Sequence, residues 1–290
     1  MKISGFTIIR NAVINDYPVV EAISSILPMV DEMIVSVGHG EDETEALIQS
    51  IHSDKIKIVQ SNWDMNLRKG GQVLAVETDK AIQHISAEAD WAFYIQADEV
   101  VHEKYHAAIL DAAQKNKDNK QVEGLLFKYL HFYGTYDYTG DSRKWYHREV
   151  RVIRNDKNIT AFKDAQGFRK NGNKLSVKLV DAYIYHYGWV KSPQQMFEKQ
   201  KNVSRFWHEN EEAWRKIQKE DFFDFNNAYD SLEKFTGTHP LVMQERIRHK
   251  NWNIELDTET KHFSPKDRVL YWIEKKTGKR LFDFQNYKIV

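Results

Sequence analysis

The sequence lacks cysteine altogether, which excludes a disulfide framework and any metal site built from thiolates. A chain without cysteine suits a reducing compartment, so we expect a cytoplasmic protein. The sequence also lacks a net charge, because 42 Lys and Arg residues balance 42 Asp and Glu residues. Domains that bind nucleic acid through bulk electrostatics carry an excess of basic residues, so we expect no nucleic-acid partner.

Long apolar runs are also missing. The apolar run within residues 1–10 is too short for a signal peptide, and no later run approaches the length needed to cross a membrane. The sequence contains neither an internal repeat nor a low-complexity tract. With 290 residues, of which 41% are hydrophobic, the chain is long enough for one sizeable core with an appendage, or for two domains.

Strand and helix patterns alternate over the first hundred residues. Runs of apolar and β-branched residues predict strands, and apolar residues at every third or fourth position predict helices between them. The predicted strands are 3–9, 33–37, 56–59 and 91–95, and the helices start near Asp16, Asp42 and Gly70, with both aspartates as capping residues. This succession predicts an α/β fold with a mostly parallel sheet, right-handed crossovers and flanking helices.

Polar residues follow each of these four strands. The carboxyl ends of parallel strands meet at one edge of the sheet, where ligands collect. The residues expected to converge there are Arg10-Asn11, Gly38, Trp63-Asp64 and Asp98-Glu99. A carboxylate at this edge can hold a hard divalent cation against substrate phosphates. The alternative is that Asp98 or Glu99 only caps the helix that follows.

The order of these elements resembles nucleotide-sugar glycosyltransferases of the GT-A fold, particularly the family-2 type. The residues that carry the resemblance are Arg10-Asn11 after the first strand, Asp42 and Thr44 after the second, and Gln96-Ala97-Asp98-Glu99 after the fourth. It covers roughly residues 3–190. The resemblance implies a GT-A (Rossmann-like) catalytic domain over 1–190, and residues 191–290 are expected to form a helical C-terminal extension.

The resemblance also implies an activity. It is metal-dependent, inverting transfer of a sugar from a nucleotide-diphospho sugar to a glycan or lipid-linked acceptor, as in surface polysaccharide biosynthesis. In the family an Asp-x-Asp motif binds the metal and the diphosphate, and here only its second acid, Asp98, is present, because Gln96 replaces the first. A histidine at a later strand end completes the metal shell in the family, and His186 matches it. An Asp/His pair suits Mn²⁺ better than Mg²⁺, while a histidine at a strand end can also be purely structural.

Further donor contacts are expected around the metal. Glu99 would support Asp98 or accept a hydrogen bond from a sugar hydroxyl. Arg10 and Asn11 would bind the base or ribose, beside Gly38, which stands where the family commonly carries acids. Lys69, with two glycines at a helix start, is a candidate anion cradle, although simple chain reversal explains the same residues.

Residues 121–190 are expected to form the acceptor half, with strands at 124–132, 149–154, 175–180 and 182–185. Trp145 and His147 lie in an aromatic loop and are candidate acceptor contacts, or ordinary core residues. Asp164 lies in a polar turn that resembles the place of the family's catalytic base. Glu149 is the second candidate, and a turn-forming role would explain Asp164 equally.

The C-terminal third predicts helices. They start at Ser192-Pro193 and run toward Trp214, at His239-Pro240, and at Ser264-Pro265, where the last one ends at Gly278. The last helix is basic and carries Trp272, so it could lie on an anionic membrane at the inner face, beside a lipid-linked acceptor. A packed helix with a solvated face is the alternative.

Two other functions remain open from the sequence. A non-catalytic sugar- or nucleotide-binding protein on the same scaffold would explain Gln96 and the missing acids after the second strand. A nucleotidyltransferase would share the alternating sheet and the acidic edge, but it should carry a glycine-rich loop after the first strand, and residues 10–16 contain no glycine.

Overall fold

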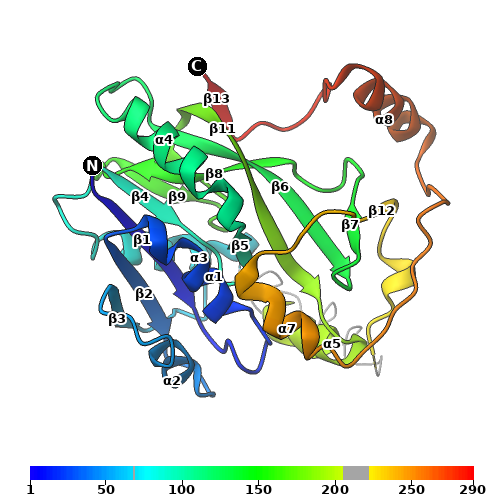
Figure 1. Cartoon of the computed structure of the whole chain (residues 1–290), viewed down its shortest axis with the longest axis horizontal. Coiled ribbons are helices and arrows are strands. Elements are labelled where there is room, and N and C mark those ends of the chain that lie inside the picture. Colours follow the sequence, from blue (N-terminus) through cyan, green and yellow to red (C-terminus); the bar gives the residue numbers. More distant parts are fainter. Residues whose placement is uncertain (68, 205–221) are drawn as a thin grey trace.

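The computed structural model describes residues 1–67, 69–204 and 222–290. Its N-terminal half contains four parallel strands in the order β3-β2-β1-β4 (Figure 1). They are β1 (Ile3–Ile9), β2 (Glu32–Gly38), β3 (Ile56–Ser61) and β4 (Trp91–Tyr94). Every residue of β1, β2 and β4 is buried, as expected for strands covered on both faces. The predicted α/β fold with a parallel sheet and flanking helices is confirmed.

Helices cover both faces of this sheet. They are α1 (Val19–Ile26), α2 (Thr44–Gln49), α3 (Gln72–Ile82) and α4 (His106–Asn116), with 3-10 turns at η1 (Leu27–Met29), η2 (Lys69–Gly71) and η3 (Glu103–Tyr105). One core cluster joins α1 and α4 to residues such as Val35 and Phe93, and a second joins α3 to Ile34 and Tyr94. Neighbouring strand residues thus enter opposite cores, so the sheet is sandwiched between helical layers.

The sheet continues into the second half of the chain in the order β4-β8-β6-β11-β10-β9. These strands are β6 (Gly124–Gly134), β8 (Arg148–Arg154), β9 (Ile159–Phe162), β10 (Gly167–Lys170) and β11 (Asn173–Val190). Two strands predicted at 175–180 and 182–185 are one strand, β11, whose pairing with β6 shifts register between Leu179 and Tyr183. That local irregularity produced the gap in the sequence pattern.

A short strand that the sequence did not reveal brings the two halves together. The strand β5 (Glu99–Val101) pairs antiparallel with β11, and Glu99 lies opposite His186. Three residues are too few to show a periodic pattern. The pairing places the residue before β5, Asp98, next to the end of β11.

The C-terminal third contains helices and strands. Its elements are α5 (Pro193–Ser204), η4 (Phe225–Asn227), β12 (Leu232–Lys234), η5 (Leu241–Met243), α7 (Gln244–Arg248), α8 (Pro265–Thr277) and β13 (Tyr287–Ile289). The expected extension therefore also contributes strands: β13 pairs with β11, and β12 pairs with β7 (Tyr138–Gly140). The predicted course of the first helix toward Trp214 lies outside the described residues.

The predicted helix boundaries differ in accuracy. For α8 they are confirmed, because the Ser264 hydroxyl accepts a hydrogen bond from the Asp267 N–H and the helix ends at Gly278. Asp16 does not cap α1; it forms an ion pair with Arg246, 2.7 Å between Oδ1 and Nη1. Asp42 lies one residue before the N-cap of α2 and accepts the N–H groups of the loop after β1. Asp42 also accepts the N–H of Thr44, the first residue of α2, at 3.1 Å, so it does bond the start of that helix, whereas Asp16 does not. In the described part of the chain, no helix has the length and apolar character needed to cross a membrane.

Candidate active site

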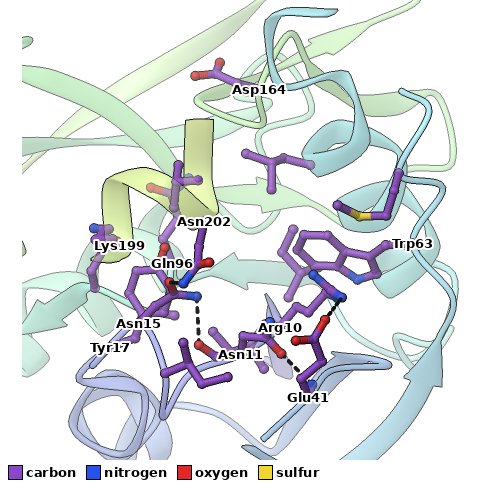
Figure 2. A pocket seen from close by; sticks show the side chains of 18 of the residues that line it. Arg10, Asn11, Asn15, Tyr17, Glu41, Trp63, Gln96, Asp164, Lys199 and Asn202 are labelled. Carbon is purple, nitrogen blue, oxygen red and sulfur yellow. Dashed lines mark hydrogen bonds and ion pairs between the residues drawn. The ribbon is translucent and has the colours of Figure 1, made fainter. Parts of the chain in front are cut away.

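A cavity of about 330 Å³ opens at the carboxyl edge of β1 and β4 (Figure 2). Its walls come from the loops after β1, β2, β3 and β4, from the turn between β9 and β10, and from α5. The polar and aromatic residues among them are Arg10, Asn11, Asn15, Tyr17, Glu41, Trp63, Tyr94, Gln96, Asp98, Asp164, Lys199 and Asn202. The predicted convergence of strand ends at one edge is confirmed for Arg10, Asn11, Trp63 and Asp98.

One wall of the cavity is a polar network after β1. The guanidinium of Arg10 donates from Nε to the His39 carbonyl oxygen at 2.8 Å and lies 4.0 Å from the Glu41 carboxylate. The Asn11 side-chain oxygen accepts from the Glu41 N–H at 2.9 Å, and its carbonyl accepts from Asn15. Figure 2 shows these residues on one side of the opening and Asp164 across from them. The network presents donors and acceptors to a ligand in a fixed arrangement.

Gly38 acts through Trp63 and does not line the cavity. A Cβ at position 38 would lie 2.4 Å from Nε1 of Trp63, so the indole can lie across the end of β2 only because residue 38 is glycine. Trp63 then forms part of the cavity wall. The sequence analysis placed Trp63 at the edge and gave it no role. A flat aromatic face in such a wall is suited to stacking on a base or a sugar ring.

Asp98 and His186 lie together, as the sequence predicted. Oδ2 of Asp98 is 3.7 Å from Nε2 of His186 and 3.4 Å from Nζ of Lys199, and the Asp98 side chain is 15% exposed. The Asp98 carbonyl also accepts a hydrogen bond from Tyr187 N–H, in continuation of the β5–β11 pairing. Burial favours the neutral acid, but the ammonium groups of Lys199 and Lys191 hold the pKa of Asp98 below its ordinary value. The carboxylate is therefore charged and can bind a cation.

The space beside this pair depends on Gly188. A Cβ at position 188 would lie 2.5 Å from Oδ2 of Asp98 and 2.9 Å from Nε2 of His186. An alanine here would push the Asp98 and His186 side chains out of their present positions. Among the described residues no group of three or more His, Cys, Asp or Glu side chains gathers to hold a metal. Asp98 and His186, with the amide of Gln96 on the same loop, are the residues that could hold a divalent cation here, and a bound molecule would have to supply further oxygens.

Lys199 is a site residue that the sequence analysis missed. Its ammonium donates to the Gly188 carbonyl oxygen at 2.8 Å and lies 4.7 Å from the centre of the Tyr17 ring. Lys191 lies behind it, almost fully buried, where burial and the charge of Lys199 lower its pKa to about 7. Lys199 comes from α5, a hundred residues after Asp98, and no local pattern marks it.

Glu99 is fully buried and does not line the cavity. Arg151 binds its carboxylate with two hydrogen bonds of 2.7 and 2.8 Å, and the Tyr129 hydroxyl adds a third at 2.7 Å. Gln96 N–H donates to the same carboxylate at 3.1 Å. The Glu99 carboxylate therefore accepts its hydrogen bonds from groups within the protein. The expected contact of Glu99 with a sugar hydroxyl does not fit the structure. Glu99 instead fixes the loop that carries Asp98.

Asp164 lines the same cavity as Asp98 from the opposite side, and also lines a neighbouring cavity of about 780 Å³. Its neighbours Lys163 and Ala165 have φ of 58° and 60°, a left-handed conformation that non-glycine residues rarely adopt. Such strain gathers at functional sites. Burial raises the pKa of Asp164. A carboxylate between two cavities, in a strained turn, is well placed to exchange a proton with a bound molecule.

The other candidates lie away from the first cavity. Lys69 lines the neighbouring cavity. Glu149 is buried, accepts a hydrogen bond from Gln166 at 2.9 Å, and has its pKa raised to about 7 by burial. Trp145 stacks on the ring of His131, with centroids 5.2 Å apart. His147 pairs with Asp283 at 3.1 Å, and burial lowers its pKa to about 4. These contacts are within the protein.

No family model and no curated protein sequence matches the chain. Solved structures of similar fold include TarS of Staphylococcus aureus in a complex with UDP, 14% identical over 75% of this chain and 69% of that one, with a TM-score of 0.39. The chain spans 43% of the longer TarS structure.

Two further solved structures have comparable likeness. Glucosyl-3-phosphoglycerate synthase of Mycobacterium tuberculosis, in a complex with Mn²⁺, UDP and phosphoglyceric acid, is 17% identical over 45% of this chain and 43% of that one, with a TM-score of 0.31. A 4-diphosphocytidyl-2C-methyl-D-erythritol synthase of Anaerococcus prevotii is 11% identical over 66% and 91%, with a TM-score of 0.39.

Proposed function

We propose that the protein is a metal-dependent, inverting glycosyltransferase. It moves a sugar from a nucleotide-diphospho sugar to a glycan or lipid-linked acceptor in surface polysaccharide biosynthesis. The observation that carries the proposal is that Asp98, which lines the cavity, lies 3.7 Å from His186, while Asp164 lines the other side of the same cavity. A cation-binding pair and a separate carboxylate are the two devices that metal-assisted glycosyl transfer needs.

The nucleotide is assigned to the wall formed by Arg10, Asn11 and Trp63. Trp63 offers an aromatic face for the base, and Arg10 and Asn11 offer donors and acceptors to the base or ribose. The diphosphate then extends toward Asp98 and Lys199. The ammonium of Lys199 is within reach of phosphate oxygens and adds to their neutralisation.

Asp98 and His186 would hold Mn²⁺ or Mg²⁺, and the bound cation would neutralise charge on the leaving diphosphate. Gln96, in place of the family's first acid, leaves the site one negative charge short. The nearby ammonium of Lys199 is compatible with that change. It neutralises part of the diphosphate charge directly, so less of that charge has to be neutralised by the cation. A thiolate ligand plays no part, since the chain has no cysteine.

Asp164 is assigned as the base. The acceptor hydroxyl gives its proton to the Asp164 carboxylate while its oxygen forms a bond to the anomeric carbon. The bond from that carbon to the diphosphate oxygen breaks, and the diphosphate leaves with the electron pair. A single displacement of this kind inverts the anomeric centre. Glu149 lies outside the cavity, so Asp164 is the better candidate for this proton transfer.

A separate observation supports a lipid-linked acceptor. No residue of α8 is buried, and Val269 and Trp272 on its surface are 57% and 62% exposed. Phe282 and Phe284 follow at 90% and 68% exposed. Lysines at positions 275, 276 and 279 flank these apolar side chains. Exposed aromatics with basic neighbours suit the interface of an anionic membrane.

The decisive experiment tests donor binding and turnover. UDP, GDP, CDP and TDP are added to the protein with and without Mn²⁺, and thermal unfolding is followed. We expect one nucleotide to raise the melting temperature, and to raise it further with Mn²⁺. The corresponding donor sugar should be hydrolysed slowly by the wild type and not by Asp98→Ala. If no nucleotide shifts the melting temperature, the donor site is wrong.

One alternative keeps a specific observation in its favour. Gln96 in place of an acid would suit a non-catalytic sugar- or nucleotide-binding protein on the same scaffold. Such a protein would show the nucleotide-dependent shift in melting temperature without any turnover of the donor sugar by the wild type. A nucleotidyltransferase would instead release diphosphate from a nucleoside triphosphate.

A further inference from the structure

His131 lies directly beside His186 in the sheet but does not line the cavity. The two residues are register partners on β6 and β11, and only 3% of His131 is exposed. The rings of Tyr129, Trp145 and Tyr146 enclose it, with centroids 5.4, 5.2 and 4.4 Å from its own. An imidazolium ion enclosed in this way would lose most of its hydration, so the His131 ring is neutral.

Two hydrogen bonds fix which nitrogen of each ring carries the hydrogen. Nε2 of His131 lies 2.7 Å from the main-chain carbonyl oxygen of Tyr146. Because a carbonyl only accepts, Nε2 of His131 carries the hydrogen, and its Nδ1 has a free lone pair. That lone pair lies 3.2 Å from Nδ1 of His186. His186 therefore donates from Nδ1, which leaves its Nε2 without a hydrogen in the neutral ring.

The lone pair of His186 Nε2 faces Asp98. The nitrogen and Oδ2 of Asp98 are 3.7 Å apart, too far for a hydrogen bond, and both atoms are acceptors. Two acceptors that face each other attract a positive charge to the space beside them. The ammonium of Lys199, 3.4 Å from the same Oδ2, is one such charge, and residue 188, a glycine, has no Cβ to come within 3 Å of both acceptors.

We propose that His131 is a positioning residue that holds His186 in the tautomer whose Nε2 is free, and thereby makes the His186–Asp98 pair a site for a divalent cation. The inference deepens the proposed function and rests on it. A carbonyl–histidine–ligand chain of this kind orients a metal ligand and raises its basicity. The same chain explains Trp145, whose ring is stacked on His131 at 28° and holds its plane.

The first test measures Mn²⁺ alone, without nucleotide, through the loss of the free-ion signal in electron paramagnetic resonance. His131→Phe keeps an aromatic ring but removes the acceptor for His186 Nδ1, so we expect about 10- to 100-fold weaker Mn²⁺ binding. His131→Asn is the matched variant, because its side-chain oxygen can replace Nδ1 as the acceptor, and it should bind Mn²⁺ within a few-fold of the wild type, by the same reasoning. Equal affinity of wild type and His131→Phe would overturn the inference.

The second test needs no metal and reads the wild type itself, with one variant used only for assignment. The ¹⁵N resonances of histidine-labelled wild type, assigned with His186→Ala, report whether Nε2 of His186 carries a hydrogen. An unprotonated Nε2 and a protonated Nδ1 support the inference, and the opposite tautomer overturns it. If the wild type has the expected tautomer but binds no Mn²⁺, the proposed metal dependence of the reaction is wrong. The cation site inferred from His131 then fails with it. If the nucleotide screen fails while Mn²⁺ binds through His131, only the proposed function fails.

Discussion

At the scale of single residues, the two carboxylates of the cavity differ in their surroundings, and their roles follow from that difference. Asp98 lies beside the ammonium of Lys199, which helps to hold its pKa low, so it stays charged and suits the proposed role of cation ligand. Asp164 has its pKa raised by burial, in a turn whose flanking residues are strained. The surroundings thus give the two carboxylates different pKa values. The one with the lower pKa suits a charged ligand, and the one with the higher pKa suits a proton acceptor.

Asp164→Asn should bind nucleotide as the wild type does, because Asp164 lies across the cavity from Arg10 and Asn11. Turnover of the donor sugar should fall by about 10²- to 10⁴-fold, the usual contribution of a general base. The two measurements are the nucleotide-induced rise in melting temperature and the rate of donor consumption. Glu149→Gln, outside the cavity, is the matched control and should keep most of the rate. A larger loss in Glu149→Gln than in Asp164→Asn would exchange the two assignments.

The pH dependence of turnover tests the same residue. Asp164 accepts a proton only when it is ionised, and burial raises its pKa above that of an exposed aspartate. As the pH is lowered, the rate should therefore begin to fall at a higher pH than it would with an exposed aspartate as the base. Above that pH the rate should stay high. The same acid limb should be absent from the residual activity of Asp164→Asn.

Sequence reasoning found those site residues that follow regular strands. Arg10, Asn11 and Asp98 come directly after long apolar runs, so the position of a strand end predicted their place. Lys199 and His131 could not be found in this way, because one lies on a helix from another part of the chain and the other lies within a strand. Glu99 was misassigned because an acidic pair at a strand end looks the same whether its second member faces a cavity or a buried arginine.

At the scale of elements, the site depends on how β5 is anchored. This strand has only three residues, yet it sets the position of Asp98 against His186. Its first residue, Glu99, is held by Arg151 from β8 in a fully buried ion pair. The long strands β1 to β4 were predictable from their apolar runs. The short strands β5, β12 and β13 were not, since their pairing depends on residues distant in the sequence.

Arg151→Met should destabilise the protein by about 3–5 kcal/mol, because it leaves the Glu99 carboxylate buried without its counter-charge. Urea unfolding measures this difference. The double variant Glu99→Gln with Arg151→Met removes the unpaired charge and should recover most of the stability. The single variant should also lose Mn²⁺-dependent nucleotide binding, because the loop that carries Asp98 is no longer fixed. Equal stability of Arg151→Met and the wild type would show that the ion pair does not anchor β5.

At the scale of the whole molecule, the C-terminal third closes on the sheet instead of forming a separate unit. The strand β13 pairs with β11, and α5 contributes Lys199 and Asn202 to the cavity. The last helix, α8, lies at the other end of this segment, away from β1 to β3 (Figure 1). The chain thus connects an exposed, basic and aromatic surface to the strand that carries His186. A lipid-linked acceptor held at that surface would reach the enzyme from a fixed direction.

The membrane surface is tested with sedimentation of vesicles. The wild type should bind vesicles that contain anionic lipid, and binding should weaken as salt is raised, because exposed charges are screened. The double variant Trp272→Ser with Phe282→Ser should lose most of the binding, since each side chain is more than half exposed. Leu241→Ser changes an equally exposed apolar residue on another segment and is the control. Because none of these side chains lines the cavity, hydrolysis of the donor sugar in solution should be unchanged in both variants. Equal sedimentation of the wild type and the double variant would mean that α8 only covers the protein, and that the acceptor is a glycan taken from solution.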